Sequence, residues 1–582
     1  MRKTKIICTI GPASQDVPVL QEMMEAGMNV ARLNFSHGTH DEHRLRIQNI
    51  RQAVGQSGKT LAIMLDTKGP EIRTGKLKTG KISLQGGQKF VLTTRDILGD
   101  NEIVQITYKS LPSEVEPGHH ILLADGLINL LVESSSDTDI VCQVINGGEL
   151  GEKKGVNVPG VRINLPFLSD KDKEDISFGI EQQVDFIAAS FVRSAEDVLE
   201  IRRMLEQQGA DIDIIAKIES QQGVDNLEAI IKVADGIMVA RGDLGVEIAP
   251  EEVPLVQKII IEKCSPSGKM VIIATQMLES MIVNPRPTRA EVSDVANAIF
   301  DGADAIMLSG ETAAGKYPVE VVKTMERIAS RAEEVLPYQE ILRQKRLQRN
   351  LSVTDAISYA TCATALSLNA SAIITPTVTG HTPKMVAKYR PQAKIIGVTT
   401  DPRILNKLTL VWGVYPQLIP ETAGTDELFS ASTRAALDGG FIENGDLVIL
   451  TAGVPTGLPG GTNLLKVHVV GDILLQGTGI GRKPVSGQVK IVIYPEDFHK
   501  IEAGDIVVTT SADRSLAPYL DKIVALVAEE GGLTSNAAIM GLNANIPVIV
   551  GASKATEVLE DNMLVTIDTV NGQIYSGLAR VR

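Results

Sequence analysis

The sequence has few aromatic residues and few cysteines. Its 582 residues include one tryptophan and four cysteines, and aromatic residues make up 3% of the chain. Because aromatic side chains are scarce, the core volume must come from Ile, Val, Leu, Ala and Met, a mixture common in α/β proteins with buried parallel strands. The four cysteines are far apart and form no CxxC pair, which indicates free thiols in a cytosolic protein.

The sequence also lacks a long apolar run and an excess of positive charge. No apolar run approaches the ~20 residues that a membrane helix needs. The basic and then apolar start, MRKTKIICTI, is broken by Gly11-Pro12 without the small-residue pattern of a cleavage site. The formal net charge of −14 disfavours binding to nucleic acid or to an acidic membrane, although it leaves room for a local basic pocket. We therefore expect a cytoplasmic protein whose partners are neither nucleic acid nor membrane.

The sequence does contain a repeated alternation of short apolar runs and helical patterns. Eight such runs lie at residues 5–10, 29–35, 61–66, 185–191, 211–219, 236–243, 270–276 and 305–311. Eight strand–helix units predict a (β/α)8 TIM barrel. The β-rich stretch 71–154 interrupts the series after the third strand and predicts a small inserted β-barrel. This insert lies in a βα loop, on the face where barrel active sites lie, so we expect it to act as a lid.

Strand and helix patterns restart after the barrel. Residues 341–471 predict a doubly wound α/β domain. A Gly-rich joint follows, and residues 472–582 mix strands with a helical pattern near Ala517–Glu530, which predicts an extra α/β domain. The predicted fold class is therefore α/β, with a catalytic barrel of residues 1–70 and 155–340, the lid, and two C-terminal domains.

Polar and charged residues follow the ends of the predicted barrel strands, where barrel enzymes place their catalytic groups. A strand period of two puts Lys217 and Glu219 on the same side of one strand. Asp243 follows the neighbouring strand, so the two carboxylates could share one Mg²⁺ while the Lys217 ammonium meets a developing anion. Three arginine side chains near these strand ends add positive charge, namely Arg32, Arg73 and Arg241. Such a set of positive charges suits a small anion such as a phosphate ester. Ordinary salt bridges at the barrel mouth would explain one such pair, but not charged or polar groups at five strand ends.

Many segments of the chain resemble pyruvate kinase. They run in order over about residues 1–470, and the longest is TRAEVSDVANAIFDGADAIMLSGETAAGKYP at Thr288–Pro318. Others include NVARLNFSHG, LDTKGPEIRTG, KKGVNVPG, AKIES and VARGDLGVE. The last segment, with GGLTSNAAI at Gly531–Ile539, is similar to the swivelling phosphohistidine domain of phosphoenolpyruvate-using enzymes.

The resemblance implies phosphoryl transfer from phosphoenolpyruvate to ADP, giving pyruvate and ATP in the last ATP-yielding step of glycolysis. It implies Mg²⁺, with Mn²⁺ as a substitute, and K⁺ as cofactors. Glu219 and Asp243 would bind Mg²⁺. The K⁺ ligands would be Asn34, Ser36, Asp66 and Thr67. Glu71, within GPEIR, matches family members that depend on K⁺.

The resemblance also implies roles for the remaining site residues. The catalytic residues would be Lys217, Arg73, Arg32 and Thr275. The substrate-binding residues would be Arg32, Gly242, Asp243, Thr275 and Lys217. The nucleotide-binding residues would be Arg73, Lys154, Asn34 and His37, with Lys153 an equally placed rival of Lys154.

A loop in the doubly wound domain is a candidate effector site. It ends a predicted strand and opens a helix, where hydroxyl and N–H groups can hold a phosphate. The candidate residues are Thr375, Thr377, Thr379, Gly380 and Thr382. Members of the family often bind a phosphorylated allosteric effector there, and the family is usually a homotetramer, with the segment Arg286–Ala298 resembling its interface helix.

Three other functions remain as alternatives. A metal-dependent aldolase could share the Glu/Asp metal site, but it has no need of a K⁺ and phosphoryl cradle. A phosphocarrier module is suggested by the tail, but Asn536 stands where the swivelling domain has its phosphorylated histidine, and an amide cannot form a phosphohistidine. A catalytically inactive scaffold has little support, because the motif positions carry the expected residues.

Overall fold

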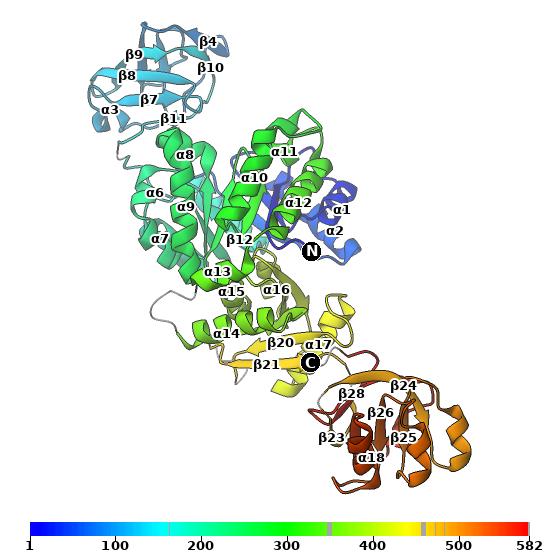
Figure 1. Cartoon of the computed structure of the whole chain (residues 1–582). Helices are drawn as coiled ribbons and strands as arrows, with labels where there is room; N and C mark the ends of the chain where they lie inside the picture. Colours follow the sequence, from blue (N-terminus) through cyan, green and yellow to red (C-terminus); the bar gives the residue numbers. More distant parts are fainter. Residues whose placement is uncertain (162, 346–351, 455–460, 472, 482, 580–582) are drawn as a thin grey trace. The chain divides into compact units, whose positions relative to one another are not determined.

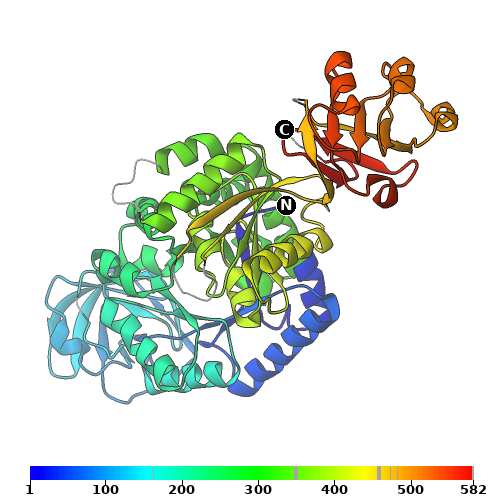
Figure 2. The same cartoon turned by 90° about the horizontal axis from the view of Figure 1, so that it is seen from below.

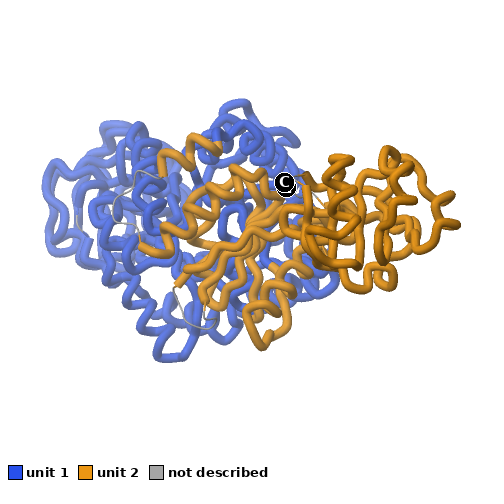
Figure 3. Tube along the Cα trace, turned by 60° about the horizontal axis from the view of Figure 1, so that its bottom comes forward, with its two compact units in different colours: residues 1–337, 401–416 blue, residues 338–400, 417–582 orange. Residues whose placement is uncertain are grey.

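The computed structural model describes residues 1–161, 163–345, 352–454, 461–471, 473–481 and 483–579. The chain forms two compact units, one of residues 1–337 and 401–416 and the other of residues 338–400 and 417–582 (Figure 3). Among the described residues, no helix combines the length and the apolar character needed to cross a membrane.

Eight parallel strands close into a barrel in the first unit, as the sequence predicted. Figure 1 shows several of the helices that surround these strands. The strands are β1 (Lys5–Thr9), β2 (Val30–Asn34), β3 (Ala62–Asp66), β12 (Phe186–Ala189), β13 (Asp213–Ile218), β14 (Gly236–Ala240), β15 (Met270–Ala274) and β16 (Ala305–Leu308). They are rich in Ile, Val, Met and Ala, and nearly every residue in them is buried, as expected for parallel strands covered on both faces.

Helices surround the barrel, and local sequence signals set where several of them begin. These helices are α1 (Val17–Glu25), α2 (His40–Ser57), α4 (Asp170–Glu181), α5 (Ala195–Gln207), α6 (Gln221–Asp225), α7 (Leu227–Val233), α8 (Arg241–Glu247), α9 (Val253–Cys264), α10 (Arg289–Asp301), α11 (Gly310–Ala313) and α12 (Pro318–Glu334). Capping boxes start α2, α4, α5 and α10, where a Ser or Thr side chain and an acidic residue three positions later satisfy backbone N–H groups reciprocally.

The insert after β3 is all-β apart from the single turn α3 (Leu111–Glu114). Its strands are β4 (Lys81–Leu84), β5 (Lys89–Thr93), β6 (Ile103–Gln105), β7 (His120–Leu123), β8 (Ile128–Ser135), β9 (Asp139–Asn146) and β10 (Gly148–Gly151). Together with β11 (Val156–Asn157), these strands form a two-stranded sheet of β10 and β4 and a six-stranded sheet with the order β11-β7-β8-β9-β5-β6. The strand β11 is the edge strand beside β7, so the larger sheet includes residues beyond 154. We keep the name lid for residues 71–154.

The doubly wound domain has a five-stranded sheet with the order β19-β18-β17-β20-β21. Its strands are β17 (Ala372–Pro376), β18 (Lys394–Thr399), β19 (Val414–Leu418), β20 (Leu447–Ala452) and β21 (Leu464–Val469). Its helices are α13 (Tyr338–Lys345), α14 (Val353–Ser367), α15 (His381–Ala387), α16 (Pro402–Leu408) and α17 (Thr425–Asp438).

The C-terminal segment forms an eight-stranded sheet, orange to red in Figure 2. Its elements are β22 (Ile473–Gln476), β23 (Thr478–Ile480), β24 (Val485–Ile491), β25 (Ile506–Thr509), β26 (Ala525–Ala528), β27 (Val548–Val550), β28 (Leu564–Asp568), β29 (Gln573–Ser576), α18 (Asn536–Ala544) and α19 (Ala555–Val558). The prediction of a helix near Ala517–Glu530 is wrong, because the apolar run there forms the buried parallel strand β26. The predicted boundary residue 472 lies outside the described residues.

Candidate active site

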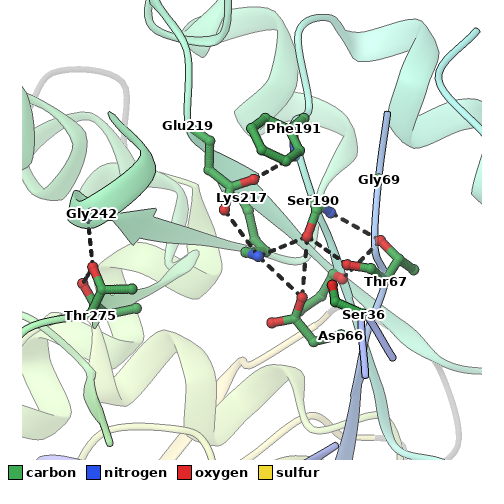
Figure 4. Close-up of polar contacts among 12 residues, drawn as sticks. Ser36, Asp66, Thr67, Gly69, Ser190, Phe191, Lys217, Glu219, Gly242 and Thr275 are labelled. Carbon is green, nitrogen blue, oxygen red and sulfur yellow. Dashed lines mark hydrogen bonds and ion pairs between the residues drawn. The ribbon is translucent and has the colours of Figure 1, made fainter. Parts of the chain in front are cut away.

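The candidate residues lie at the carboxyl ends of the barrel strands and in the segments that directly follow them. A closed parallel barrel brings all of these strand ends to one face. Lys217 belongs to β13 and Asp66 to β3, whereas Glu219 follows β13 by one residue. Figure 4 draws these side chains together with the polar contacts that join them.

Lys217 is the centre of this cluster. Its Nζ lies 3.0 Å from Glu219 Oε1 and 3.1 Å from Asp66 Oδ1, and it donates a hydrogen bond of 2.7 Å to Ser190 Oγ. The side chain is buried, and burial opposes its charge, but Asp66 and Glu219 outweigh this effect and raise the pKa of Lys217. The structure therefore holds the Lys217 ammonium at a buried position between two carboxylates. The short distance to Glu219 agrees with the prediction that Lys217 and Glu219 lie on the same side of the strand.

Glu219 is buried and accepts a second hydrogen bond of 2.6 Å from the backbone N–H of Phe191. Burial raises the pKa of Glu219 to about 7, against the opposing charge of Lys217. Asp243 is close enough to add to this rise, and it lies in the first turn of α8 rather than in a strand as predicted. A divalent cation would relieve the cost of holding these two carboxylates ionised.

The chemistry of this pair fits Mg²⁺. Among the described residues, no group of three or more His, Cys, Asp or Glu side chains could hold a metal ion. Mg²⁺ is typically bound through one or two carboxylates, with the remaining positions taken by water and substrate oxygens. Two carboxylates beside an ammonium therefore suit a metal that is completed by its substrate.

Asp66 joins Lys217 to Arg32. Arg32 Nε lies 2.6 Å from Asp66 Oδ2, and Arg32 also donates to Thr9 Oγ1 at 2.8 Å. Burial opposes ionisation of Asp66, but Arg32 and Lys217 hold the pKa of its carboxyl below the usual range. Arg32 is thus oriented by a buried carboxylate at the barrel mouth.

The residues predicted to bind K⁺ lie on β2, β3 and the segments after them. The Asn34 side chain accepts from the backbone N–H of Ser36 at 3.1 Å. The carbonyl of Thr67 accepts from Ser190 Oγ at 2.7 Å, and its hydroxyl accepts from the Ser190 N–H at 3.1 Å. Ser190 therefore links three of the groups named from the sequence, since it also contacts Asp66 and Lys217.

Thr275 and Gly242 contact each other. Thr275 follows β15 in a left-handed backbone conformation with φ +67°, which L residues rarely adopt. The N–H of Gly242 donates to Thr275 Oγ1 at 2.7 Å. Arg241, counted from the sequence among the cations of the mouth, instead pairs with Asp294 of α10 at 2.7 Å and donates to the Thr275 carbonyl at 2.9 Å. Arg241 therefore links the turn at Thr275 to Asp294 of α10.

Arg73 lies at the start of the lid and pairs with Glu71. Its Nε lies 2.7 Å and its Nη2 3.1 Å from the two Glu71 oxygens, and its Nη1 donates to the Lys153 carbonyl at 2.9 Å. Arg73 and Lys153 line a cavity of about 570 Å³ that does not include Lys154. Lys153, Lys154 and His37 all have exposed side chains.

In the doubly wound domain, two candidate hydroxyls already have partners within the fold. Thr375 Oγ1 donates to the Ile396 carbonyl at 3.0 Å, and Thr382 Oγ1 shares a hydrogen bond of 2.8 Å with Thr462 Oγ1. Thr377 Oγ1 accepts from the Gly380 N–H at 2.9 Å, and Thr379 is exposed.

Sequence reasoning missed three residues of the site. Ser190 and Phe191 directly follow β12, and neither has a charged side chain. Asp125 lies in the lid turn after β7 and is close enough to Arg73 and Asp243 to influence the pKa of each. The left-handed φ of Phe191 and Asp125 could not be read from the residue types.

Three family models match the chain. Residues 1–322 match the barrel domain of pyruvate kinase, and residues 355–468 match its alpha/beta domain. Residues 501–572 match the mobile domain of PEP-utilising enzymes.

Curated and solved relatives agree with these matches. The chain is 55% identical to the pyruvate kinase of Geobacillus stearothermophilus over 584 residues and 54% identical to that of Bacillus licheniformis over 585 residues, and each alignment covers 100% of both chains. A crystal structure of a pyruvate kinase from Cryptosporidium parvum is similar with a TM-score of 0.77 and 42% identity, covering 80% of this chain and 96% of that one.

Proposed function

Because the chain belongs to the pyruvate kinase family and transfers a phosphoryl group from phosphoenolpyruvate to ADP, we propose that Lys217, Asp66 and Glu219 form its reaction centre. The observation that carries this proposal is the buried Lys217 ammonium, which lies within 3.1 Å of a carboxylate oxygen of Asp66 and of one of Glu219. During transfer, the bond from phosphorus to the enolate oxygen breaks and a bond to the terminal phosphate oxygen of ADP forms. A fixed positive charge stabilises the enolate oxygen as its negative charge develops.

Members of this family are kinases that need metal ions, and the ions proposed here are Mg²⁺, with Mn²⁺ as a substitute, and K⁺. Glu219 and Asp243 would hold the divalent ion, which supplies positive charge near the transferring group when bound. The residues proposed for K⁺ are Asn34, Ser36, Asp66 and Thr67. Their oxygen atoms suit a hard cation. Glu71 is the residue from which we propose that the activity depends on K⁺.

The substrate carboxylate is proposed to lie at the start of α8. The backbone N–H groups of Gly242 and Asp243 lie in the first turn of this helix, where such groups have no acceptor within the helix. In the structure, the N–H of Gly242 donates to Thr275 Oγ1. A bound carboxylate would replace Thr275 Oγ1 as the acceptor for the Gly242 N–H. The Thr275 hydroxyl would then rotate and donate a hydrogen bond to the same carboxylate. Arg32, held by Asp66, would contact the phosphate.

Arg73 and Lys154 are proposed to bind the phosphates of the nucleotide, with Asn34 and His37 on the barrel side. Lys153 remains the rival of Lys154, and its place in the cavity beside Arg73 supports it. Arg73 is also proposed to contact the transferring phosphoryl group. Its pairing with Glu71 keeps the guanidinium in one orientation before the substrates arrive.

We also propose regulation by a phosphorylated effector bound in the doubly wound domain, around Thr375, Thr377, Thr379, Gly380 and Thr382. A cavity of about 460 Å³ adjoins this loop and supports the proposal. The polar residues in its lining are Ser352, Thr354, His381, Thr462 and Asn463. The hydrogen bond between Thr382 and Thr462 connects the cavity with the loop.

The remaining proposals concern the whole chain. We propose that the enzyme is a cytoplasmic homotetramer, and that the domain limits are 1–70 with 155–340, 71–154, 341–471 and 472–582. Asn536 is the first residue of α18, after the cap residue Ser535. Because an amide at this position cannot carry phosphate as a histidine does, we propose a structural or regulatory role for the last domain.

A coupled assay for pyruvate tests the proposed centre. The chain is assayed with phosphoenolpyruvate, ADP and Mg²⁺, with and without K⁺, and beside its Glu219→Ala variant. We expect activity that needs Mg²⁺, rises with K⁺ and collapses in the variant. Activity without response to K⁺ would remove the cation assignment, and full activity of the variant would remove Glu219 from the centre.

A further inference from the structure

The helix α8 carries proposed ligands at one end and contacts the segment after the lid at the other. Gly242 and Asp243 lie in its first turn, and Glu247 is its last residue. The side-chain amide of Asn157 donates a hydrogen bond of 2.8 Å to Glu247 Oε1. Asn157 is the last residue of β11, which pairs with β7 of the lid.

A turn of the lid also approaches the same end of α8. A Cβ built on Gly126 would lie 3.8 Å from Val246 Cγ1, so the backbone of this turn runs close to the Val246 side chain. Gly126 follows Ala124 and Asp125, and all three have left-handed φ angles, of +84°, +53° and +58° respectively. The N–H of Ala124 donates to the carbonyl of Gly155 at 3.2 Å, which ties this turn to the chain that leads into β11.

The geometry of a helix relates these contacts to the metal site. Asp243 and Glu247 are four residues apart, so their side chains share one face of α8. The helix has only seven residues, so a shift imposed at Glu247 is carried to Asp243 within a single turn. Glu247 itself is only partly buried.

We propose that the hydrogen bond between Asn157 and Glu247 positions α8, so that the Asp243 carboxylate is set for the metal ion according to the placement of the lid. Glu247 and Asn157 are positioning residues, and the proposal rests on the proposed role of Asp243. The lid and the metal site are then coupled through protein contacts, in addition to any ligand that touches both.

An exchange of the two polar groups tests this coupling. Asn157→Asp places a carboxylate against Glu247 and removes the donor, while Glu247→Gln keeps an acceptor oxygen and nearly the same shape. The double variant restores a hydrogen bond in the reverse direction, from the new amide at position 247 to the new carboxylate at position 157. Glu251→Gln, which alters an exposed carboxylate just after α8, is the matched control.

The readouts are the Mg²⁺ concentration for half-maximal activity, kcat, the KM for phosphoenolpyruvate, and direct Mn²⁺ binding to the full chain without nucleotide. We expect Asn157→Asp to raise the half-activating Mg²⁺ concentration and to weaken Mn²⁺ binding by about tenfold, as outer partners of metal ligands do. The double variant should recover to within a few-fold of the parent, and Glu247→Gln and Glu251→Gln should change little.

Two outcomes would overturn the proposal. One is an unchanged metal dependence in Asn157→Asp, and the other is a double variant as impaired as that single variant. A wrong assignment of the reaction centre would give a different result. In that case, the parent chain itself would show no Mg²⁺-dependent formation of pyruvate in the same assay.

Discussion

Replacement of Lys217 by Met removes the central charge of the site while keeping the shape of an unbranched side chain. In the structure, this ammonium lies 3.0 Å from Glu219 and 3.1 Å from Asp66. At an effective dielectric constant of about 20, a charge pair at this distance is worth about 5 kcal/mol. Loss of one fixed electrostatic contact to a transition state typically lowers kcat about 10²–10³-fold, and we expect at least this loss in Lys217→Met.

The same variant predicts a change in how Mg²⁺ binding depends on pH. Burial raises the pKa of Glu219 to about 7 in the parent, and loss of the neighbouring positive charge should raise it further. A protonated carboxyl does not bind the ion, so Mg²⁺ affinity should stay nearly intact at a pH above the new pKa. It should then fall up to about tenfold for each pH unit below it. Calorimetric titration of Mg²⁺ from about pH 6 to about pH 9 measures this profile, in a range that extends above the pKa of about 7 in the parent.

Lys407→Met is the matched control for loss of a buried lysine. Lys407 is also buried, and it lies 2.8 Å from Asp211 and 2.7 Å from Asp213. It belongs to residues 401–416, which form one compact unit with residues 1–337. Both variants should lose thermal stability, because each leaves carboxylates without their partner. Only Lys217→Met should lose turnover by orders of magnitude. A Lys217→Met enzyme that keeps most of its turnover would refute the assignment, as would a Lys407→Met enzyme with an equal loss of kcat.

Three further predictions follow from other parts of the molecule. Glu71→Lys should make activity largely independent of K⁺ and raise the KM for ADP, because it supplies a positive charge and releases Arg73 from its 2.7 Å contact; unchanged activation by K⁺ would contradict this. Burial raises the pKa of Asp185 to about 6, above its unfolded value, so its ionisation should cost the native state up to about 3 kcal/mol as the pH rises from about 4 to about 6. The melting temperature of the parent should therefore fall relative to that of Asp185→Asn over this range, and a constant difference would contradict the prediction. Incubation with radiolabelled phosphoenolpyruvate should leave no acid-labile phosphate on residues 472–582, and its detection there would show that Asn536 does not prevent the carrier chemistry.

Local sequence signals predicted the eight barrel strands and the all-β insert. Buried parallel strands need unbroken apolar runs, and the polar residues that follow such runs mark the barrel mouth. The same reasoning placed Lys217 and Glu219 on one side of a strand, and their charged atoms lie 3.0 Å apart. The apolar run of β26 does not distinguish a strand from a helix, because a short buried strand and a buried helix cannot be separated by periodicity alone.

The identities of the polar partners were decided by tertiary structure. Ser190 contacts Lys217 and Asp66, which are 27 and 124 residues away in sequence, and no local pattern encodes those distances. Arg241 follows a barrel strand as the other candidates do, but its guanidinium pairs with Asp294.

Strand period, helix capping and motif order are local properties of the chain, and for this reason the sequence alone predicts the barrel, the family and the chemical types of the site residues. Only the folded chain decided which groups pair. The hydrogen bond from Asn157 to Glu247 spans 90 residues, and it forms because the closure of the barrel and the return of the chain from the lid bring β11 against α8.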